Sequence, residues 1–368
     1  MMMQVFLDNI VFSIQKAGGV SAYWYELLSG MCNSDLSVGI LNARPQSDNI
    51  FEKKIDYNDF NCIRESWIPC KYLRYLPLRY PLPAGAVFHG GYLRVSPQKN
   101  ILNILTVHDF AHERKLASKF PRGLANTMQK AYGIQRADGI ICISDSTRKE
   151  LLHFFPTINP AKVKVIYHGI GNFYQINKQQ PVSCSLDIDL GEKFILYVGA
   201  RRNYKNFSMA VKTMELLPPS FHLVVIGGEP WNKEEISMMK EKIAGRYHIF
   251  PTINQADLNI LYNYAFCLLY TSAYEGFGLP PGEAMKAGCP VVTTGMTSIP
   301  EVVGNAGLMA EKPDPLLFAE KISSLENETF KQQLIARGLK QVQQFTWDKS
   351  VLETIDFYKD CWNFKFTT

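Results

Sequence analysis

The sequence contains no C-x-x-C pair, although eight cysteines are scattered over its 368 residues. Cys142, Cys267 and Cys289 fall in apolar runs, which fits buried, reduced thiols better than a disulfide framework and predicts a cytoplasmic protein. No apolar run approaches the ~20 residues that span a bilayer. The apolar run 4–12 contains Asp8 and follows no basic leader, so we expect a first core strand there rather than a signal peptide.

The sequence also lacks a large excess of either charge, because it has 39 Lys and Arg residues and 34 Asp and Glu residues, which give a net charge of +5. This mild excess is compatible with phosphate-bearing ligands or an anionic surface, but it does not indicate a nucleic-acid partner. Internal repeats and low-complexity tracts are absent as well. The length therefore predicts two globular domains of roughly 150–200 residues each.

Short β-branched runs alternate with amphipathic segments, which is typical of doubly wound α/β sheets. In the first half we expect strands over 4–7, 37–42, 86–89, 102–107, 139–143 and 163–167, and helices over 20–31, 122–136 and 146–155. A polar, turn-rich stretch over 171–191 predicts an interdomain linker. In the second half we expect strands over 194–198, 222–226, 248–250, 266–270 and 290–293, and helices over 206–217, 233–243, 255–264, 281–287, 318–325, 330–345 and 347–362.

The string EGFGLPPGEAM, residues 275–285, places two carboxylates on either side of a glycine- and proline-rich turn. A helix is expected to begin within it, with Glu283 in the first turn beside free backbone amides. Such amides can hold phosphate oxygens, and carboxylates accept hydrogen bonds from sugar hydroxyls. A bare pair of glutamates at this spacing would more simply be solvated or capping residues, but the complete string is far more specific.

The string closely resembles the donor-site motif of the retaining glycosyltransferases of family 4, the glycosyl transferases group 1. The resemblance extends through AGCPVV at 287–292, SIPEV at 298–302 and GNAGL at 304–308. It implies the α/β GT-B fold, in which two Rossmann-like domains face each other across a cleft. The implied domains are an acceptor-side domain over 1–175, onto which a C-terminal helix at 346–368 packs back, and a donor domain over 190–345.

The resemblance also implies roles for individual residues. Glu275 would orient the sugar hydroxyls and Glu283 would bind the ribose, while Gly276, Phe277, Gly278 and Leu279 would contact the donor. Arg201 and Lys205 match the residues that hold the diphosphate leaving group. The chemistry agrees, because cations at the start of a helix are unfavourable unless an anion lies nearby.

In the first domain, Gly18 and Gly19 resemble the family's glycine loop and would contact the donor. His108 ends a predicted strand and resembles a histidine near the reacting sugar, whereas His89 is as well explained by a structural role. The basic and aromatic stretch 64–80 can be read as a membrane-docking surface or as a packed segment, and the packed segment is favoured because its charges are few.

Together these features predict a retaining hexosyltransferase of polysaccharide biosynthesis, such as that of lipopolysaccharide or O-antigen. It would use a nucleotide diphosphate sugar, a glycan or lipid-linked acceptor, and neither cofactor nor metal. A lipid-linked acceptor would require only peripheral contact with the inner face of the cell membrane. Two alternatives stay open, which are a nucleotide-sugar epimerase of the same fold and a binding protein without turnover.

Overall fold

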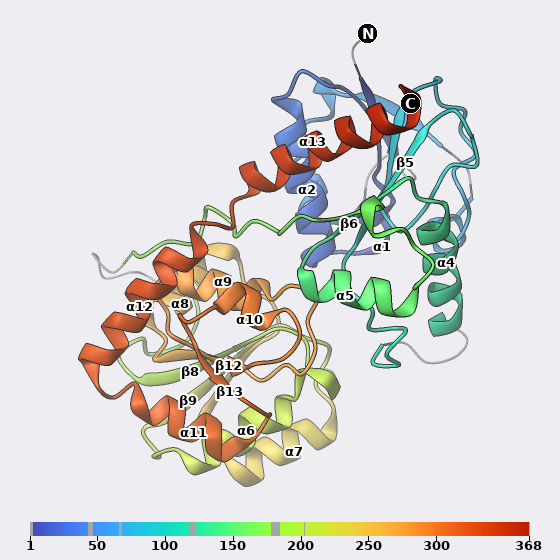
Figure 1. The fold of residues 1–368 in the computed structure, drawn as a ribbon. Coiled ribbons are helices and arrows are strands. Elements are labelled where there is room, and N and C mark those ends of the chain that lie inside the picture. Colours follow the sequence, from blue (N-terminus) through green and yellow to red (C-terminus); the bar gives the residue numbers. More distant parts are fainter. Residues whose placement is uncertain are drawn as a thin grey trace. The chain divides into compact units, whose positions relative to one another are not determined.

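The computed structural model describes residues 3–42, 47–65, 68–117, 122–177, 185–201 and 203–367. The chain forms two compact units (Figure 1). Unit 1 comprises Met1–Gly169 and Trp347–Thr368, and unit 2 comprises Ile170–Thr346. Each unit contains one parallel sheet flanked by helices.

Unit 1 is built on a seven-stranded sheet in the order β3-β2-β1-β4-β5-β6-β7, with parallel pairing throughout. Its strands are β1 (Gln4–Asp8), β2 (Ser37–Asn42), β3 (Asn61–Arg64), β4 (Val87–Gly90), β5 (Leu102–Val107), β6 (Gly139–Cys142) and β7 (Val163–Val165). Its helices are α1 (Ile10–Ile14), α2 (Gly19–Cys32), α3 (Cys70–Leu73), α4 (Arg122–Arg136), α5 (Asp145–Phe154) and α13 (Trp347–Phe366), with short 3-10 turns at Glu52–Lys54, Tyr57–Asp59 and Pro160–Lys162.

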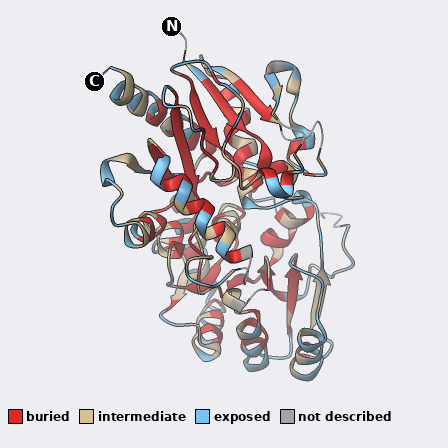
Figure 2. Ribbon diagram, turned by 90° about the vertical axis from the view of Figure 1, so that its right-hand side faces the viewer, coloured by how far each residue is buried: buried red, intermediate tan, exposed pale blue. Residues whose placement is uncertain are grey.

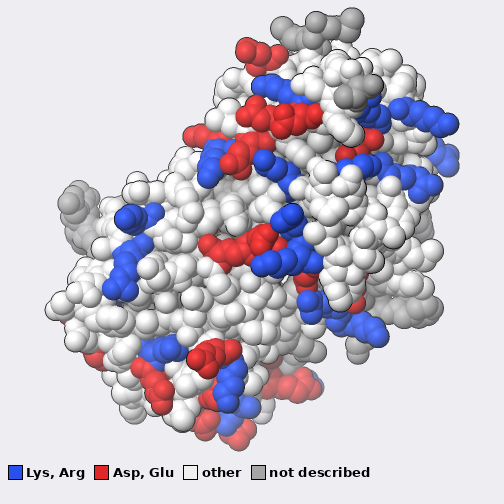
Figure 3. All heavy atoms as spheres, viewed as in Figure 1, with Lys and Arg blue, Asp and Glu red and all other residues white. Residues whose placement is uncertain are grey.

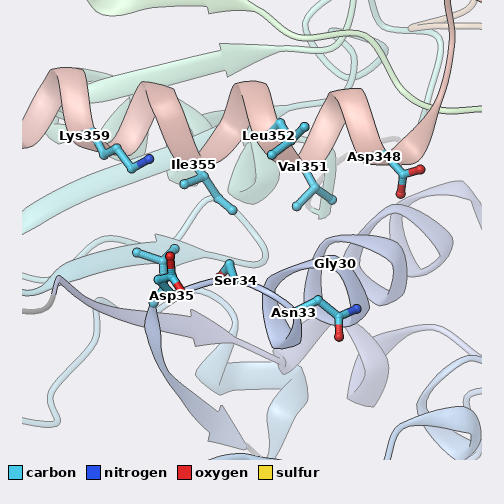
Figure 4. Close-up of a pocket in the computed structure, with 10 residues that line it drawn as sticks. Gly30, Asn33, Ser34, Asp35, Asp348, Val351, Leu352, Ile355 and Lys359 are labelled. Atoms are coloured by element: carbon cyan, nitrogen blue, oxygen red, sulfur yellow. The ribbon is translucent and has the colours of Figure 1, made fainter.

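The C-terminal helix α13 belongs to the core of unit 1 and lies beside α2 (Figure 1). Gly30 of α2 permits this close approach, because a Cβ atom there would lie 2.6 Å from Val351. Gly169 is equally constrained, since a Cβ atom would lie 2.3 Å from the backbone nitrogen of Trp347. Figure 4 shows the open groove between α13 and the C-terminal end of α2, with Val351 and Ile355 turned towards it.

A buried ion cluster explains the acidic residue in the first strand. Asp8 ends β1, and its carboxylate accepts a hydrogen bond of 3.0 Å from Arg94, whose guanidinium also binds Glu65. Burial raises the pKa of Asp8 to about 6, although the nearby Arg94 charge opposes the rise. The cluster joins the ends of β1 and β3 to the loop that follows β4.

Unit 2 is built on a six-stranded parallel sheet in the order β10-β9-β8-β11-β12-β13. Figure 2 shows the strands of both sheets as largely buried. The strands are β8 (Lys193–Val198), β9 (Phe221–Ile226), β10 (Tyr247–Phe250), β11 (Cys267–Tyr270), β12 (Val291–Thr294) and β13 (Leu308–Ala310). The helices are α6 (Phe207–Leu216), α7 (Lys233–Lys242), α8 (Gln255–Tyr264), α9 (Leu279–Lys286), α10 (Ile299–Val303), α11 (Pro315–Ser324) and α12 (Glu328–Val342), with a 3-10 turn at Asn203–Lys205.

The expected α/β class with two parallel-sheet domains is confirmed, as is the return of the last helix to the first unit. The predicted linker differs from the structure, because the two units divide between Gly169 and Ile170, ahead of the polar stretch. Residues 170–177 instead pack on unit 2, where the side chains of Asn259 and Asn263 accept hydrogen bonds from the backbone of Gln175 and Asn177.

The surface carries no strongly biased charge on the face drawn in Figure 3, where acidic and basic side chains are intermingled. Among the described residues, no helix combines the length and the apolar character needed to cross a bilayer.

Candidate active site

The carboxyl ends of the strands of unit 2 bring together Lys205 and Glu275, which are 70 residues apart. Lys205 Nζ donates a hydrogen bond of 2.5 Å to Glu275 Oε1, and the hydroxyl of Tyr270 donates to the same oxygen. Both charged side chains keep limited access to solvent, with 17% of the lysine and 12% of the glutamate side chain exposed. The pair therefore offers a cation and an anion side by side at the edge of the sheet where ligands of α/β proteins bind.

Hydrogen bonds to the backbone hold the two loops in register. Thr271 Oγ1 donates to the carbonyl oxygen of Lys205 at 2.8 Å, and Ala273 N donates to that of Tyr204 at 2.8 Å. Thr297 Oγ1 accepts from the backbone amide of Glu275 at 3.0 Å. The position of the Lys205–Glu275 pair is thus set by the fold before any ligand binds.

Ser298 supports the same loop from the neighbouring segment, where its hydroxyl contacts the carbonyl oxygens of Glu275 and Phe277, each at 2.9 Å. Thr297, Ser298 and Tyr270 were not among the site residues predicted from the sequence. Of these three residues, only Ser298 had a signal in the sequence, because it begins the segment SIPEV.

Helix α9 begins two residues earlier than expected, at Leu279, so Glu283 lies in its second turn rather than its first. Gly278 precedes the helix with a φ of 106°, a left-handed backbone conformation that glycine tolerates. Pro280 and Pro281 follow Leu279, and proline suits the first turn of a helix. The first free amides of α9 are consequently those around Leu279, not those around Glu283.

Glu283 is held by two tyrosines. Tyr262 donates a hydrogen bond of 3.1 Å to Glu283 Oε2, and Tyr174 donates a second hydrogen bond to the carboxylate. Burial raises the pKa of Glu283 to about 7, while the two hydroxyl groups act in the opposite direction. This carboxyl group therefore ionises at a higher pH than an ordinary glutamate.

The remaining residues of the motif have distinct positions. Phe277 is buried and its ring meets that of Phe345 edge-on at 5.6 Å, so this side chain fixes the loop to unit 2. Gly278 is also buried, whereas Gly276 and Leu279 keep partial exposure. Of these four predicted donor contacts, Gly276 and Leu279 are the most accessible.

Arg201 occupies a different environment from the one expected for a phosphate ligand. Its side chain is 2% exposed, and its guanidinium donates to the carbonyl oxygens of Gly227 and Glu229 and to the carboxylate of Glu235. It also lies 3.7 Å from the ring centre of Trp231. Through these contacts Arg201 holds the loop after β9 in place. Lys205 is the more accessible of the two predicted phosphate ligands.

Unit 1 places its predicted residues at the carboxyl end of its own sheet. Gly18 has a φ of 148° and precedes α2, of which Gly19 is the first residue. Tyr23, one turn further on, contacts the ring of His108 with centres 5.3 Å apart, and His108 stacks on His168 at 5.5 Å. The structure therefore brings His108 close to the helix that the glycine loop begins.

Burial lowers the pKa of His108 to about 4, and that of His168 falls well below its usual range. Both rings are consequently neutral at physiological pH. His89 is structural, because its two ring nitrogens contact Tyr358 Oη at 2.5 Å and Thr106 Oγ1 at 2.9 Å.

The stretch 64–80 supports the packed interpretation over most of its described length. Cys70, Leu73 and Leu78 are buried, whereas Tyr72 is 59% exposed beside Lys71. Residue Trp67 lies outside the described residues.

Residues 183–341 match the family model of glycosyl transferases group 1, and residues 17–171 match that of glycosyltransferase family 4. The two matches together cover most of the chain. The chain is a family 4 glycosyltransferase.

Curated relatives of this glycosyltransferase include O-antigen chain mannosyltransferase B of Escherichia coli, which is 29% identical over 252 residues, 65% of this chain and 65% of the relative. The serotype-specific mannosyltransferase WbdA of Escherichia coli is 28% identical over 232 residues, 60% of this chain and 28% of the relative. The match thus spans less than two thirds of the length of each relative.

Solved structures agree on the GT-B fold. Sucrose-phosphate synthase from Thermosynechococcus elongatus superposes with a TM-score of 0.77 at 20% identity over 97% of this chain and 98% of that chain. WaaG, a glycosyltransferase involved in lipopolysaccharide biosynthesis, superposes with a TM-score of 0.68 at 14% identity over the whole of both chains.

Proposed function

We propose that this protein is a retaining hexosyltransferase that moves a hexose, with mannose favoured, from a nucleotide diphosphate sugar to a hydroxyl of a growing polysaccharide. The observation that carries the proposal is the Lys205–Glu275 pair at the carboxyl edge of the unit 2 sheet, followed by Glu283 on α9. The names of the mannosyltransferase relatives support the sugar and the class of acceptor.

In this proposal Lys205 is the residue that stabilises the diphosphate leaving group. As the bond between the sugar and the diphosphate breaks, negative charge grows on the β-phosphate, and a positioned ammonium group stabilises that charge. In the free protein Glu275 neutralises Lys205 through the 2.5 Å contact. Glu275 then turns its second oxygen, or its whole carboxylate, to the sugar hydroxyls when the donor binds.

Glu283 binds the ribose hydroxyls. Tyr262 and Tyr174 keep its carboxyl group in place by hydrogen bonding. The first amides of α9, around Leu279, are suited to an oxygen of the diphosphate, because free N–H groups at a helix start attract anions. Arg201 acts here as a positioning residue for the loop after β9 rather than as a direct phosphate ligand.

The reaction proceeds on one face of the sugar. The anomeric C–O bond to the diphosphate breaks, and the acceptor oxygen forms a new bond to the same face of the anomeric carbon. The acceptor proton moves to an oxygen of the departing β-phosphate, which balances the charge. Glu275, held by Lys205 and Tyr270, orients the sugar without forming a bond to it.

The acceptor is proposed to be a glycan or a lipid-linked oligosaccharide. A lipid-linked acceptor would bring the enzyme to the inner face of the cell membrane as a peripheral protein. Pelleting the protein with vesicles that do or do not contain anionic lipid tests this point, and equal absence from both pellets would contradict it.

The test of the reaction is incubation with a panel of nucleotide diphosphate sugars, including a mannose donor, with and without an oligosaccharide acceptor. We expect release of nucleotide diphosphate that depends on the acceptor, with retained anomeric configuration in the product. Conversion of the donor sugar without acceptor would instead identify an epimerase, and binding without conversion would identify a binding protein.

Lys205→Ala should lower kcat by about 10²–10³, the effect of removing one preorganised donor from a developing anion. Lys212→Ala, which removes an exposed lysine of α6, is the matched control and should keep full activity. Near-normal turnover in Lys205→Ala would overturn the leaving-group assignment.

The two glutamates are separated by calorimetry with the free nucleotide diphosphate. Glu283→Ala should weaken binding by about 1.5–3 kcal/mol, the range for a lost charge-assisted hydrogen bond, whereas Glu275→Ala should leave it nearly unchanged and damage only turnover. Equal losses of nucleotide affinity in the two variants would refute this division of roles.

A further inference from the structure

Two histidines and a glutamate meet at the opposite edge of the unit 2 sheet. Glu192 immediately precedes β8, His222 is the second residue of β9 and His248 is the second residue of β10. These positions are the amino ends of three neighbouring parallel strands, whereas Lys205 and Glu275 follow the carboxyl ends. The proposed sugar transfer uses none of the three residues.

The strand register places the two histidines on one face of the sheet. His222 pairs with Phe194 of β8, and His248 pairs with Val224 of β9, two residues beyond His222. Since side chains alternate along a strand, His222 and Val224 share a face, and His248 shares it too. Glu192 lies two residues before Phe194 and approaches the same face.

The side-chain atoms are spaced as metal ligands require. His222 Nδ1 lies 3.4 Å from Glu192 Oε2, and one ligand atom from each of the three residues lies within 4.8 Å of the other two. Ligands about 2.0–2.2 Å from a tetrahedral ion are roughly 3.4 Å apart, so the first pair already fits and a small side-chain rotation brings in the third.

The immediate surroundings leave the imidazole available. His222 Nδ1 is buried and makes no hydrogen bond within the described residues. The rings of His222 and His248 stack with centres 5.8 Å apart and planes 22° apart. Lys193 Nζ donates hydrogen bonds of 3.0 Å to both carboxylate oxygens of Glu326, so its charge is paired outside the cluster.

We propose that Glu192, His222 and His248 form a binding site for a divalent zinc ion. Two imidazole nitrogens and one carboxylate are a ligand set suited to zinc, which commonly completes its four-coordinate shell with water. A metal ion held there would join the starts of β8, β9 and β10. Its role is to stabilise unit 2, and the proposal is independent of the sugar-transfer chemistry.

The test is calorimetric titration of the full-length protein with Zn²⁺ alone, after dialysis against a chelator. We expect one zinc ion per chain in the parent protein, and His222→Ala and His248→Ala should each weaken binding by at least about 100-fold. His153→Ala removes an exposed histidine of α5 in unit 1 and is the matched control, with unchanged affinity expected.

A second measurement separates ligand loss from misfolding. Added Zn²⁺ should raise the Tm of the parent in a concentration-dependent manner, because a ligand that binds only the folded state stabilises it. Glu192→Gln, which keeps the shape of an exposed side chain, should fold normally and lose most of this shift. Failure of the parent to bind Zn²⁺, or equal affinity in both histidine variants and the parent, would overturn the proposal.

Discussion

Replacing Glu283 by Gln should make the protein more stable at alkaline pH while weakening its affinity for nucleotide. The structure gives the reason, because at alkaline pH Glu283 carries a negative charge in a largely buried environment between Tyr262 and Tyr174. Glutamine keeps the shape and an oxygen that accepts a hydrogen bond from Tyr262. It removes the ionisation and replaces one of the two acceptor oxygens by an NH2 donor.

The magnitude follows from the pKa. The difference between an ordinary glutamate pKa of 4.5 and the raised value of about 7 corresponds to about 3 kcal/mol. Between these two pH values the folded chain holds a proton that the unfolded chain has released, so stability falls as pH rises. Glu283→Gln should therefore gain about 3 kcal/mol at pH 8 but less than about 1 kcal/mol at pH 5.

The assay compares the denaturant midpoints of the variant and the parent at pH 5 and pH 8. The chain has two units and need not unfold in a single step. The informative quantity is therefore the difference between the two midpoints, variant minus parent, and how that difference changes with pH. Glu320→Gln, which alters an exposed carboxylate of α11, should show no such change.

Nucleotide diphosphate affinity should move in the opposite direction, falling roughly tenfold in Glu283→Gln, because a neutral amide replaces a charge-assisted acceptor. A stability difference that is the same at pH 5 and pH 8 would refute the argument from burial. Unchanged nucleotide affinity would refute the ribose role alone.

Three further predictions concern the rest of the molecule. Gly169→Ala should lower stability by about 2–3 kcal/mol and reduce Tm, because its Cβ atom would lie 2.3 Å from the backbone of Trp347, whereas Gly171→Ala meets only an ordinary 3.6 Å contact and should change Tm little. Burial lowers the pKa of His89 to about 3, that of His108 to about 4 and that of His168 well below its usual range, so these three groups together lower stability on acidification from pH 6 towards pH 4.5 by up to about 4 kcal/mol per pH unit. The raised pKa values of Asp8 and Glu283 offset about 3 kcal/mol per pH unit of this loss, so the net stability should fall by about 1 kcal/mol per pH unit, and a stability that rises over this range would contradict the argument. Activity at 25 °C should survive EDTA because Lys205 supplies positive charge at the leaving group, and loss of turnover that Mg²⁺ or Mn²⁺ restores would show that a metal is required.

The sequence by itself determined the alternation of strands and helices, because hydrophobic periodicity is a local property. Expected segments such as 102–107, 122–136 and 255–264 agree with the structure residue for residue. Short elements were missed where the local signal is weak, including α1, β3 and β13, which have three to five residues each. The start of α9 also differed, since proline and glycine mark a helix start only to within a few residues.

Only the tertiary structure shows which groups the charged residues contact. Arg201 was predicted to bind phosphate from its basic loop alone, and its partners in the structure, Gly227, Glu229 and Glu235, lie 26 to 34 residues further along the chain. The pKa of Glu283 likewise depends on burial and on two tyrosines from other segments. Distances and burial of this kind arise when separate segments pack together, and a one-dimensional pattern does not contain them.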